Sequence, residues 1–243
     1  MSQDVDGLIK EILLGGIGLE LQTHGFQSFS VFYSNPYVTL LRREGYRYYI
    51  AGLNPGGAGE PQKGMDEYEW IQRRWKSEPR SAYLIEDDEN WKTNFQPNMK
   101  RFGDCWLQPQ NHMALRHIFS TNAIFARSPG ADSLVGKDSA LFDLCWRWHR
   151  RFLDIIRPRI IIAISNDKAK PSAFNLFRDC LQNRSTEEPI KIYGVYSIKR
   201  SQGVLDLPSG PLEVRLVGLP HLSYCNVARN PDVIRMLRET DWL

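Results

Sequence analysis

Three short polar motifs in this chain combine residue types that can bind a ligand and handle protons. The first spans residues 52–59, where Asn54 stands among glycines directly after strand-forming residues. An asparagine amide offers an acceptor and donors, and glycines let a backbone turn sharply and approach a ligand. The motif lacks the Gly-Lys-Ser/Thr ending of a phosphate loop and the Gly-x-Gly-x-x-Gly frame of a dinucleotide site. A plain tight turn and a ligand-binding loop of another kind both remain open.

The second motif reads Pro220-His221-Leu222-Ser223 and follows an apolar stretch at residues 212–219. A histidine just past the end of a strand can face a ligand, where it can donate a hydrogen bond to a departing oxygen or bind a proton. Ser223 can cap a helix or hold a phosphate. The alternative for His221 is a structural histidine whose ring nitrogens are satisfied inside the protein.

The third motif is Ser120-Thr121-Asn122, again at the end of a strand-forming stretch. The amide of Asn122 can pair with the edge of a pyrimidine, which presents a carbonyl beside an N–H group. The alternative is an ordinary turn residue at the end of a strand.

Hydrophobic patterning predicts the elements that must position these motifs. The continuous apolar run at residues 159–165 is typical of a central strand covered on both faces. Apolar residues at helical spacing, with arginines on the other face, predict a helix at residues 138–156. In full, we expect strands at 46–51, 117–125, 159–165, 190–198 and 212–219, and helices at 1–15, 66–76, 172–180 and 232–238 as well.

Alternation of strands and helices along the chain predicts an α/β protein, with three α/β/α layers around a central, mostly parallel sheet. In such sheets ligands bind outside the carboxyl ends of the strands. The three polar motifs all fall at such ends. The chain of 243 residues suits one domain, residues 1–243, and the charged and aromatic stretch at about residues 60–110 predicts an insertion or flap outside the core.

Charge and cysteine spacing limit the classes of function. A net charge of +3 permits an anionic partner without requiring one. The cysteines have no short spacing, so we expect no metal or iron–sulfur site, and the pattern of the N-terminal residues leads us to expect no signal peptide. No span has membrane length, and we expect a cytoplasmic protein without a membrane partner. Basic residues gather at Arg147, Arg150, Arg151, Arg157 and Arg159. This group forms either a solvated helix face or a phosphate-binding surface.

Taken together, the motifs resemble those of the uracil-DNA glycosylase superfamily. Gly52-Leu53-Asn54-Pro55-Gly56 resembles its Gly-x-Asn-Pro-Gly motif, in the mismatch-specific and single-strand-selective branches where asparagine replaces aspartate. His221-Leu222-Ser223 resembles its His-Pro-Ser motif, with leucine in place of proline. Asn122 falls between the two, where a strand-end asparagine of that family contacts the target base. The resemblance spans roughly residues 46–224.

The resemblance implies a DNA glycosylase, a hydrolase of base-excision repair that flips a base out of DNA and cleaves its bond to deoxyribose. It implies that Asn54 positions the attacking water, that His221 donates a hydrogen bond to the departing base, and that Asn122 reads the base edge. It implies no cofactor, a monomer, and single- or double-stranded DNA as the partner. The further contacts that it implies are as follows: Gly52, Leu53 and Phe125 with the base; Pro55, Gly56, Gly57 and Ser223 with phosphate or DNA; and Leu222 or Tyr224 as a wedge in the gap left by the base.

Two other interpretations stay open. The same scaffold can recognise a modified base or single-stranded nucleic acid without cutting it, and the leucine at position 222 favours that alternative. A doubly wound sheet can also hold an enzyme that acts on free nucleosides or nucleotides.

Overall fold

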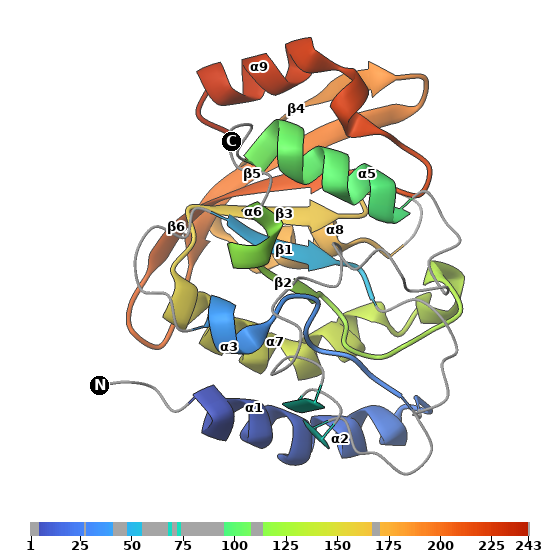
Figure 1. The fold of residues 1–243 in the computed structure, drawn as a ribbon, viewed down its shortest axis with the longest axis vertical. Helices are drawn as coiled ribbons and strands as arrows, with labels where there is room; N and C mark the ends of the chain where they lie inside the picture. The colour runs from blue at the N-terminus through green and yellow to red at the C-terminus, as the bar shows by residue number, and fades with distance from the viewer. Residues whose placement is uncertain are drawn as a thin grey trace.

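The structure is a computed structural model that describes residues 5–26, 28–40, 48–54, 68–69, 72–73, 95–107, 114–166 and 171–242. A mixed sheet of six strands forms the centre of this described part, in the order β2-β1-β3-β6-β5-β4 (Figure 1). The first four strands run parallel, and β5 and β4 extend the sheet as an antiparallel hairpin. The strand bounds are Tyr48–Gly52 (β1), Phe119–Asn122 (β2), Ile160–Ile164 (β3), Gln182–Tyr193 (β4), Tyr196–Leu205 (β5) and Leu212–Leu219 (β6).

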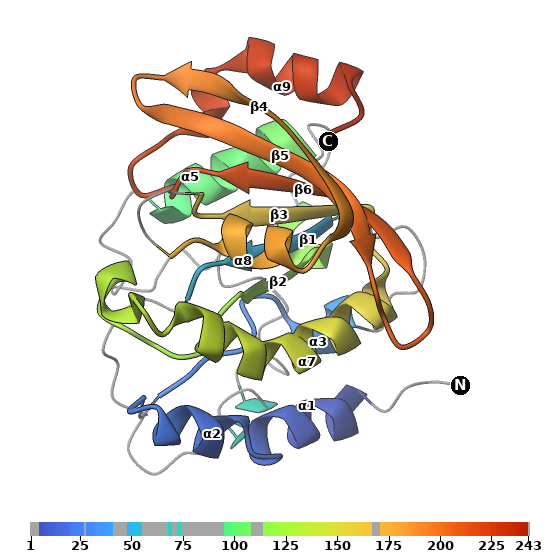
Figure 2. The same ribbon diagram turned by 180° about the vertical axis from the view of Figure 1, so that it is seen from behind.

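Helices cover both faces of the sheet, which confirms the expected α/β architecture (Figures 1 and 2). The first face carries α1 (Val5–Leu14), α2 (Ile17–Thr23), α7 (Asp138–Ile156) and α8 (Ala173–Asp179). The second face carries α5 (Phe95–Phe102) with the π-helical turn Gly103–Leu107, α6 (Ala114–His117), and α9 (Pro231–Glu239). The short α3 (Pro36–Thr39) and the 3-10 turns Ala131–Leu134 and Val227–Arg229 complete the described helices.

Alternate residues of the central strands feed two separate hydrophobic cores. Ile161 and Ala163 point into the core beneath α7, whereas Ile160, Ile162 and Ile164 point into the core beneath α5. We call these the α7 core and the α5 core. A strand whose side chains alternate between two covered faces must be apolar at every position, which is the physical reason for the unbroken run in β3.

The clearest sequence predictions of helices are confirmed. Helix α7 has the predicted bounds, and it ends where Arg157 adopts a left-handed φ of 46° directly before Pro158. Helix α9 begins as expected from Asn230-Pro231, because the Asn230 side-chain oxygen accepts a hydrogen bond from the Val233 N–H at 3.3 Å.

The arginines of α7 tie the helix to neighbouring elements. Arg147 donates to Glu20 of α2 at 2.8 and 3.0 Å, and Arg151 donates to Glu11 of α1 at 2.5 Å. Arg150 and Arg157 donate to backbone oxygens of Asp206 and Pro211, in the loop between β5 and β6. These four arginines of the predicted basic group therefore have partners within the protein, and Arg159 is exposed directly before β3.

Two sequence predictions are wrong in part. Residues 190–198 form the end of β4, a turn and the start of β5, because β4 is an exposed edge strand whose polar residues hide its pairing from an apolar pattern. Residues 95–107 are no flap: Met99, Phe102 and Trp106 are buried in the α5 core. Other residues of the 60–110 stretch lie outside the described residues, apart from 68–69 and 72–73.

A buried histidine connects α7 to the strands that precede the polar motifs. His149 is fully buried, its Nε2 lies 3.0 Å from the Ala123 carbonyl oxygen, and its Nδ1 lies 2.7 Å from the Tyr49 hydroxyl. Because a carbonyl only accepts, Nε2 carries the proton and Nδ1 accepts from Tyr49. Burial lowers the His149 pKa to about 4.

The helices in the described part of the chain include none with the length and apolar character of a membrane span.

We expect His149 to make the fold sensitive to acid. The unfolded chain binds a proton at this histidine near pH 6.5, whereas the folded chain resists protonation down to about pH 4. Stability is therefore fully present above pH 6.5 and falls as the pH drops from 6.5 to 4, by about 3 kcal/mol in total. The double variant Tyr49→Phe/His149→Phe should lose less stability over this range in urea unfolding, and the exposed control His24→Gln should follow the wild type. Equal losses in the wild type and the double variant would contradict the role of His149.

Candidate active site at the carboxyl edge of the sheet

The four parallel strands end at one edge of the sheet, and a polar motif follows each of them. Asn122 ends β2, Asn54 follows β1, Ser165 and Asn166 follow β3, and His221 follows β6. Neighbouring strands lie about 4.8 Å apart, so the ends of β1 and β6, which flank β3, are roughly 10 Å apart. The structure thus brings the three sequence-predicted motifs to one edge.

Gly52 and Asn122 are directly paired across β1 and β2. Gly52 shares its face of the strand with Ile50, a residue of the α5 core, so the Asn122 side chain lies on that same face. A Cβ on Gly52 would meet the Asn122 side-chain oxygen at 2.6 Å. A glycine at position 52 therefore leaves the space in which the Asn122 amide lies.

The amide nitrogen of Asn122 is a buried donor without a partner among the described residues. The residue is 4% exposed, and its Nδ2 atom makes no hydrogen bond. An unpaired buried donor costs roughly 1–3 kcal/mol, so native structures usually satisfy such groups. An N–H group of this kind at a sheet edge is suited to a ligand carbonyl.

His221 lies on the α5 side of the same edge. Its ring contacts Phe95, the first residue of α5, at a centroid distance of 5.3 Å. The Ser223 N–H donates to Nδ1 at 3.3 Å, so Nε2 is the nitrogen that carries the proton in the neutral ring. Although the side chain is exposed, the protein atoms around it disfavour the charged ring and lower the His221 pKa. His221 is therefore a neutral donor through Nε2 at pH 7.

Asn54 is held by a residue that the sequence analysis did not single out. Its amide nitrogen donates to the Ser128 hydroxyl at 2.7 Å, and that hydroxyl donates to the Gly130 carbonyl at 3.0 Å. Ser128 begins a Ser-Pro-Gly sequence after β2. This sequence predicts a turn, but it gives no signal of a contact with Asn54. The contact fixes the amide plane of Asn54 and directs its nitrogen toward Ser128.

Ser165 and Asn166 join the strand ends between Asn54 and His221. Ser165 has a φ of 109°, which side-chain-bearing residues rarely adopt, and its N–H donates to the Leu219 carbonyl at 2.9 Å. The buried Asn166 amide donates to the carbonyl oxygens of Ser197 and Gly218 at 2.7 and 2.8 Å. These bonds hold β3, β5 and β6 together at the edge. Sequence reasoning missed both residues, and their only local signal is their place at the end of the apolar run.

Three side chains assigned to base or DNA contact are core residues instead. Leu222 is fully buried in the α5 core, and its carbonyl accepts from the Asn98 amide at 2.7 Å, so it cannot act as a wedge. Phe125 is fully buried in the α7 core against the His149 ring, so it cannot stack on a base. Leu53 is 6% exposed in the α7 core, and its carbonyl accepts from the Ile124 N–H at 2.8 Å, so its side chain is not presented to a ligand. Apolar residues next to polar motifs can face either way, and packing decides which.

The remaining predicted residues divide into two groups. Ser223 is half-buried and Tyr224 is 74% exposed, both in the loop that carries His221. Pro55, Gly56 and Gly57 lie outside the described residues. Within the described residues, no group of histidine, cysteine and acidic side chains is arranged to hold a metal ion.

Comparisons with family models, with curated proteins and with solved structures found no match to this chain.

The fit between Gly52 and Asn122 predicts energetic coupling. Gly52→Ala should destabilise the protein by about 1–3 kcal/mol because the new methyl group meets the Asn122 amide. In an Asn122→Ala background the same change should cost clearly less, as measured by a double-mutant cycle in urea.

Gly218→Ala is the matched control for this cycle. A Cβ at position 218 meets the Phe174 ring at 2.5 Å, so Asn122→Ala should leave its cost unchanged. Additive effects of Gly52→Ala and Asn122→Ala would show that the two residues do not share this space.

Proposed function

We propose that this protein is a DNA glycosylase that hydrolyses the N-glycosidic bond of uracil or a related damaged base. The observation that carries the proposal is the buried amide N–H of Asn122, which has no partner among the described residues and lies at the same sheet edge, and on the same face, as the neutral donor His221. A pyrimidine flipped out of DNA presents carbonyl oxygens that can accept from such donors. The resemblance of the three motifs to the uracil-DNA glycosylase superfamily agrees with this choice.

His221 would stabilise the departing base. Cleavage breaks the bond between C1′ and the base nitrogen, and the electron pair of that bond leaves with the base, which becomes an anion. The Nε2–H group of His221 donates a hydrogen bond to the base oxygen where this charge develops. A donor in such a position contributes about 3–4 kcal/mol to the lowering of the barrier.

Asn54 would position the water that completes the reaction. The water oxygen forms the new bond to C1′, one of its protons passes to solvent, and the products are the free base and an abasic sugar. The Ser128 contact orients the Asn54 amide so that its carbonyl oxygen can accept from the water. An amide accepts a proton poorly, so the reaction should be slower than with a carboxylate at this position.

We place the enzyme in the cytoplasm as a monomer that acts on DNA without a metal or cofactor. All four cysteines are free, as is usual in a reducing compartment.

The proposal is tested with oligonucleotides that contain one uracil, in single-stranded and duplex form, by quantifying abasic sites. We expect His221→Ala to lower kcat by about 10²–10³-fold and Asn54→Ala to abolish most of the remaining activity. Asn54→Asp should raise kcat, because a carboxylate can take the proton. Asn122→Ala should raise KM for the uracil-containing oligonucleotide by a larger factor than it raises the Ki of an abasic product analogue.

His117→Gln, in α6 and away from the motifs, is the control for general effects on the protein. Activity that survives both Asn54→Ala and His221→Ala would reject the assignments. Binding of uracil-containing DNA without any abasic product would select the non-catalytic binding module, and a thermal shift with free nucleosides alone would select a small-molecule enzyme.

The lowered pKa of His221 predicts the acid limb of the pH profile. Protonation of Nδ1 would break the contact from the Ser223 N–H and release the ring from its orientation. Because the pKa lies below the ordinary histidine value of 6.5, kcat should stay constant as the pH falls through 6.5 and decline only at lower pH. A decline centred at or above pH 6.5, absent in His221→Gln, would contradict a neutral donor.

A further inference from the structure

A row of aromatic side chains leads away from the candidate site. The His221 ring lies 5.3 Å from Phe95 on one side and 5.6 Å from Tyr224 on the other, between ring centroids. Tyr193 and Tyr196 form a second pair at 5.3 Å. We call these five residues the aromatic strip.

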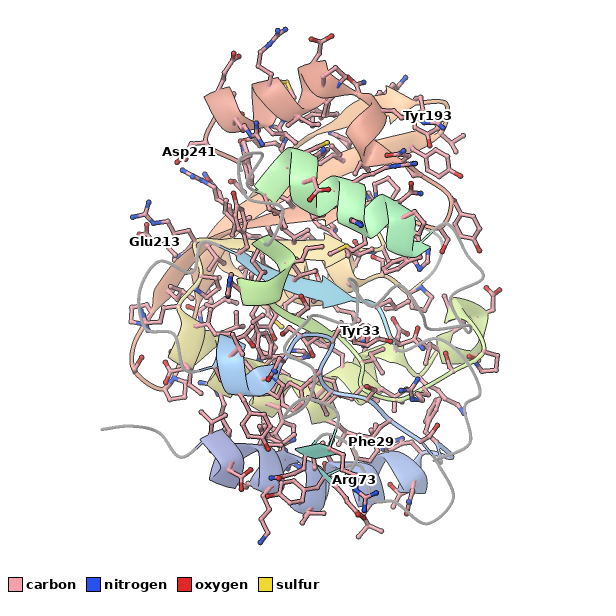
Figure 3. All side chains as sticks on the ribbon, viewed as in Figure 1. Phe29, Tyr33, Arg73, Tyr193, Glu213 and Asp241 are labelled. Atoms are coloured by element: carbon pink, nitrogen blue, oxygen red, sulfur yellow. The ribbon has the colours of Figure 1, made fainter. Side chains whose placement is uncertain are left out.

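The β4–β5 hairpin brings the second pair to the site. Lys199 of β5 pairs with Gly218 of β6, and the two strands are antiparallel, so the start of β5 lies beside the carboxyl end of β6. Figure 1 shows the hairpin turn on the side of the sheet toward which the parallel strands point, and Figure 3 labels Tyr193 there. The antiparallel extension of the sheet thus carries two tyrosines to the edge that holds His221.

A polar contact holds the hairpin against the loop of His221. The Tyr193 hydroxyl donates to the Tyr224 carbonyl at 3.5 Å. Its pKa is raised, first by burial and then by a hydrogen bond with Cys225 in the same loop. The hydroxyl of Tyr193 therefore contacts the loop of His221, while the residue remains 43% exposed.

The exposed rings are suited to stacking on nucleobases. Tyr224 is 74% exposed although it contacts His221, and no described contact buries its outer face. Isolated exposed tyrosines are common, but this strip is continuous with the residue proposed to act on the base. Lys191, two residues before Tyr193 in β4, and Arg229 in the turn after the loop are exposed and add positive charge for phosphates.

We propose that the aromatic strip is a subsite for a single strand, in which it binds the nucleotides next to the target base. The inference rests on the proposed function, because it specifies the substrate of the same site. In a duplex the flanking bases are stacked and paired, whereas in a single strand their faces are free to stack on Tyr224 and Tyr193. Every base has such a face, so binding should depend little on sequence.

To test the proposed role of the aromatic strip, binding of nucleic acid is measured separately from cleavage. The probe is a short, fluorescein-labelled thymidine oligonucleotide without uracil, alone or annealed to its complement, with Kd read by fluorescence anisotropy. Tyr224→Ala and Tyr193→Ala should each raise Kd for the single strand about tenfold and leave Kd for the duplex almost unchanged. Tyr224→Phe keeps the ring and should bind like the wild type. Val195→Ser, at a 91% exposed turn residue, controls for the loss of exposed apolar surface.

Three other outcomes overturn the inference, each in a distinct way, and a fourth rejects the proposed glycosylase activity alone. Unchanged single-strand binding in both alanine variants would reject the strip even if the wild type produces abasic sites. Weaker binding to the duplex alone would assign Tyr224 as a wedge that fills the gap in paired DNA. A concentration-dependent dimer of the wild type that Tyr224→Ala dissociates would show that a second copy covers the strip. Strip-dependent binding without abasic product would reject the glycosylase and leave the strip as a nucleic-acid surface.

Discussion

Parallel pairing around β3 is the constraint on which the candidate site depends. Because β1, β2, β3 and β6 run in one direction, their carboxyl ends meet at one edge, and motifs far apart in the chain become neighbours. The pairing persists because β3 is buried on both faces, with its isoleucines divided between the α5 and α7 cores. Loss of either helical layer would expose apolar strand surface and remove the frame that sets the positions of Asn54, Asn122 and His221.

At that edge, two residues hold states that cost free energy in the protein alone. Asn122 keeps an amide N–H without a partner in the described part of the molecule, and Ser165 holds a left-handed backbone. Both cost free energy in the absence of a ligand. By contrast, His149 beneath the α7 side is buried with both ring nitrogens bonded, so it contributes to structure alone. The hydrogen-bonding state of a polar side chain, more than its type, separates a candidate site residue from a structural one.

The antiparallel hairpin extends the sheet beyond the four parallel strands and adds a second surface to the site. Its polar, exposed edge strand packs little of the core, yet its turn meets the loop that carries His221. The same loop buries Leu222 and exposes Tyr224, two residues apart, because a turn directs them to opposite sides. Base recognition and strand recognition would thus come from separate elements, the parallel strand ends and the hairpin, that share one loop.

The sequence alone determined the elements whose cause is local. The isoleucine run of β3, the apolar stripe of α7 and the Asn230-Pro231 start of α9 follow from periodicity and capping within a few residues. The polar motifs at strand ends were also visible, since glycine, asparagine and histidine stand out after apolar stretches. Only the tertiary structure decided that residues 95–107 are core, that Leu222 and Phe125 face inward, and that Gly52 adjoins Asn122. These facts depend on which distant segments pack or pair, and the direction of a side chain relative to another element is not encoded in its neighbours along the chain.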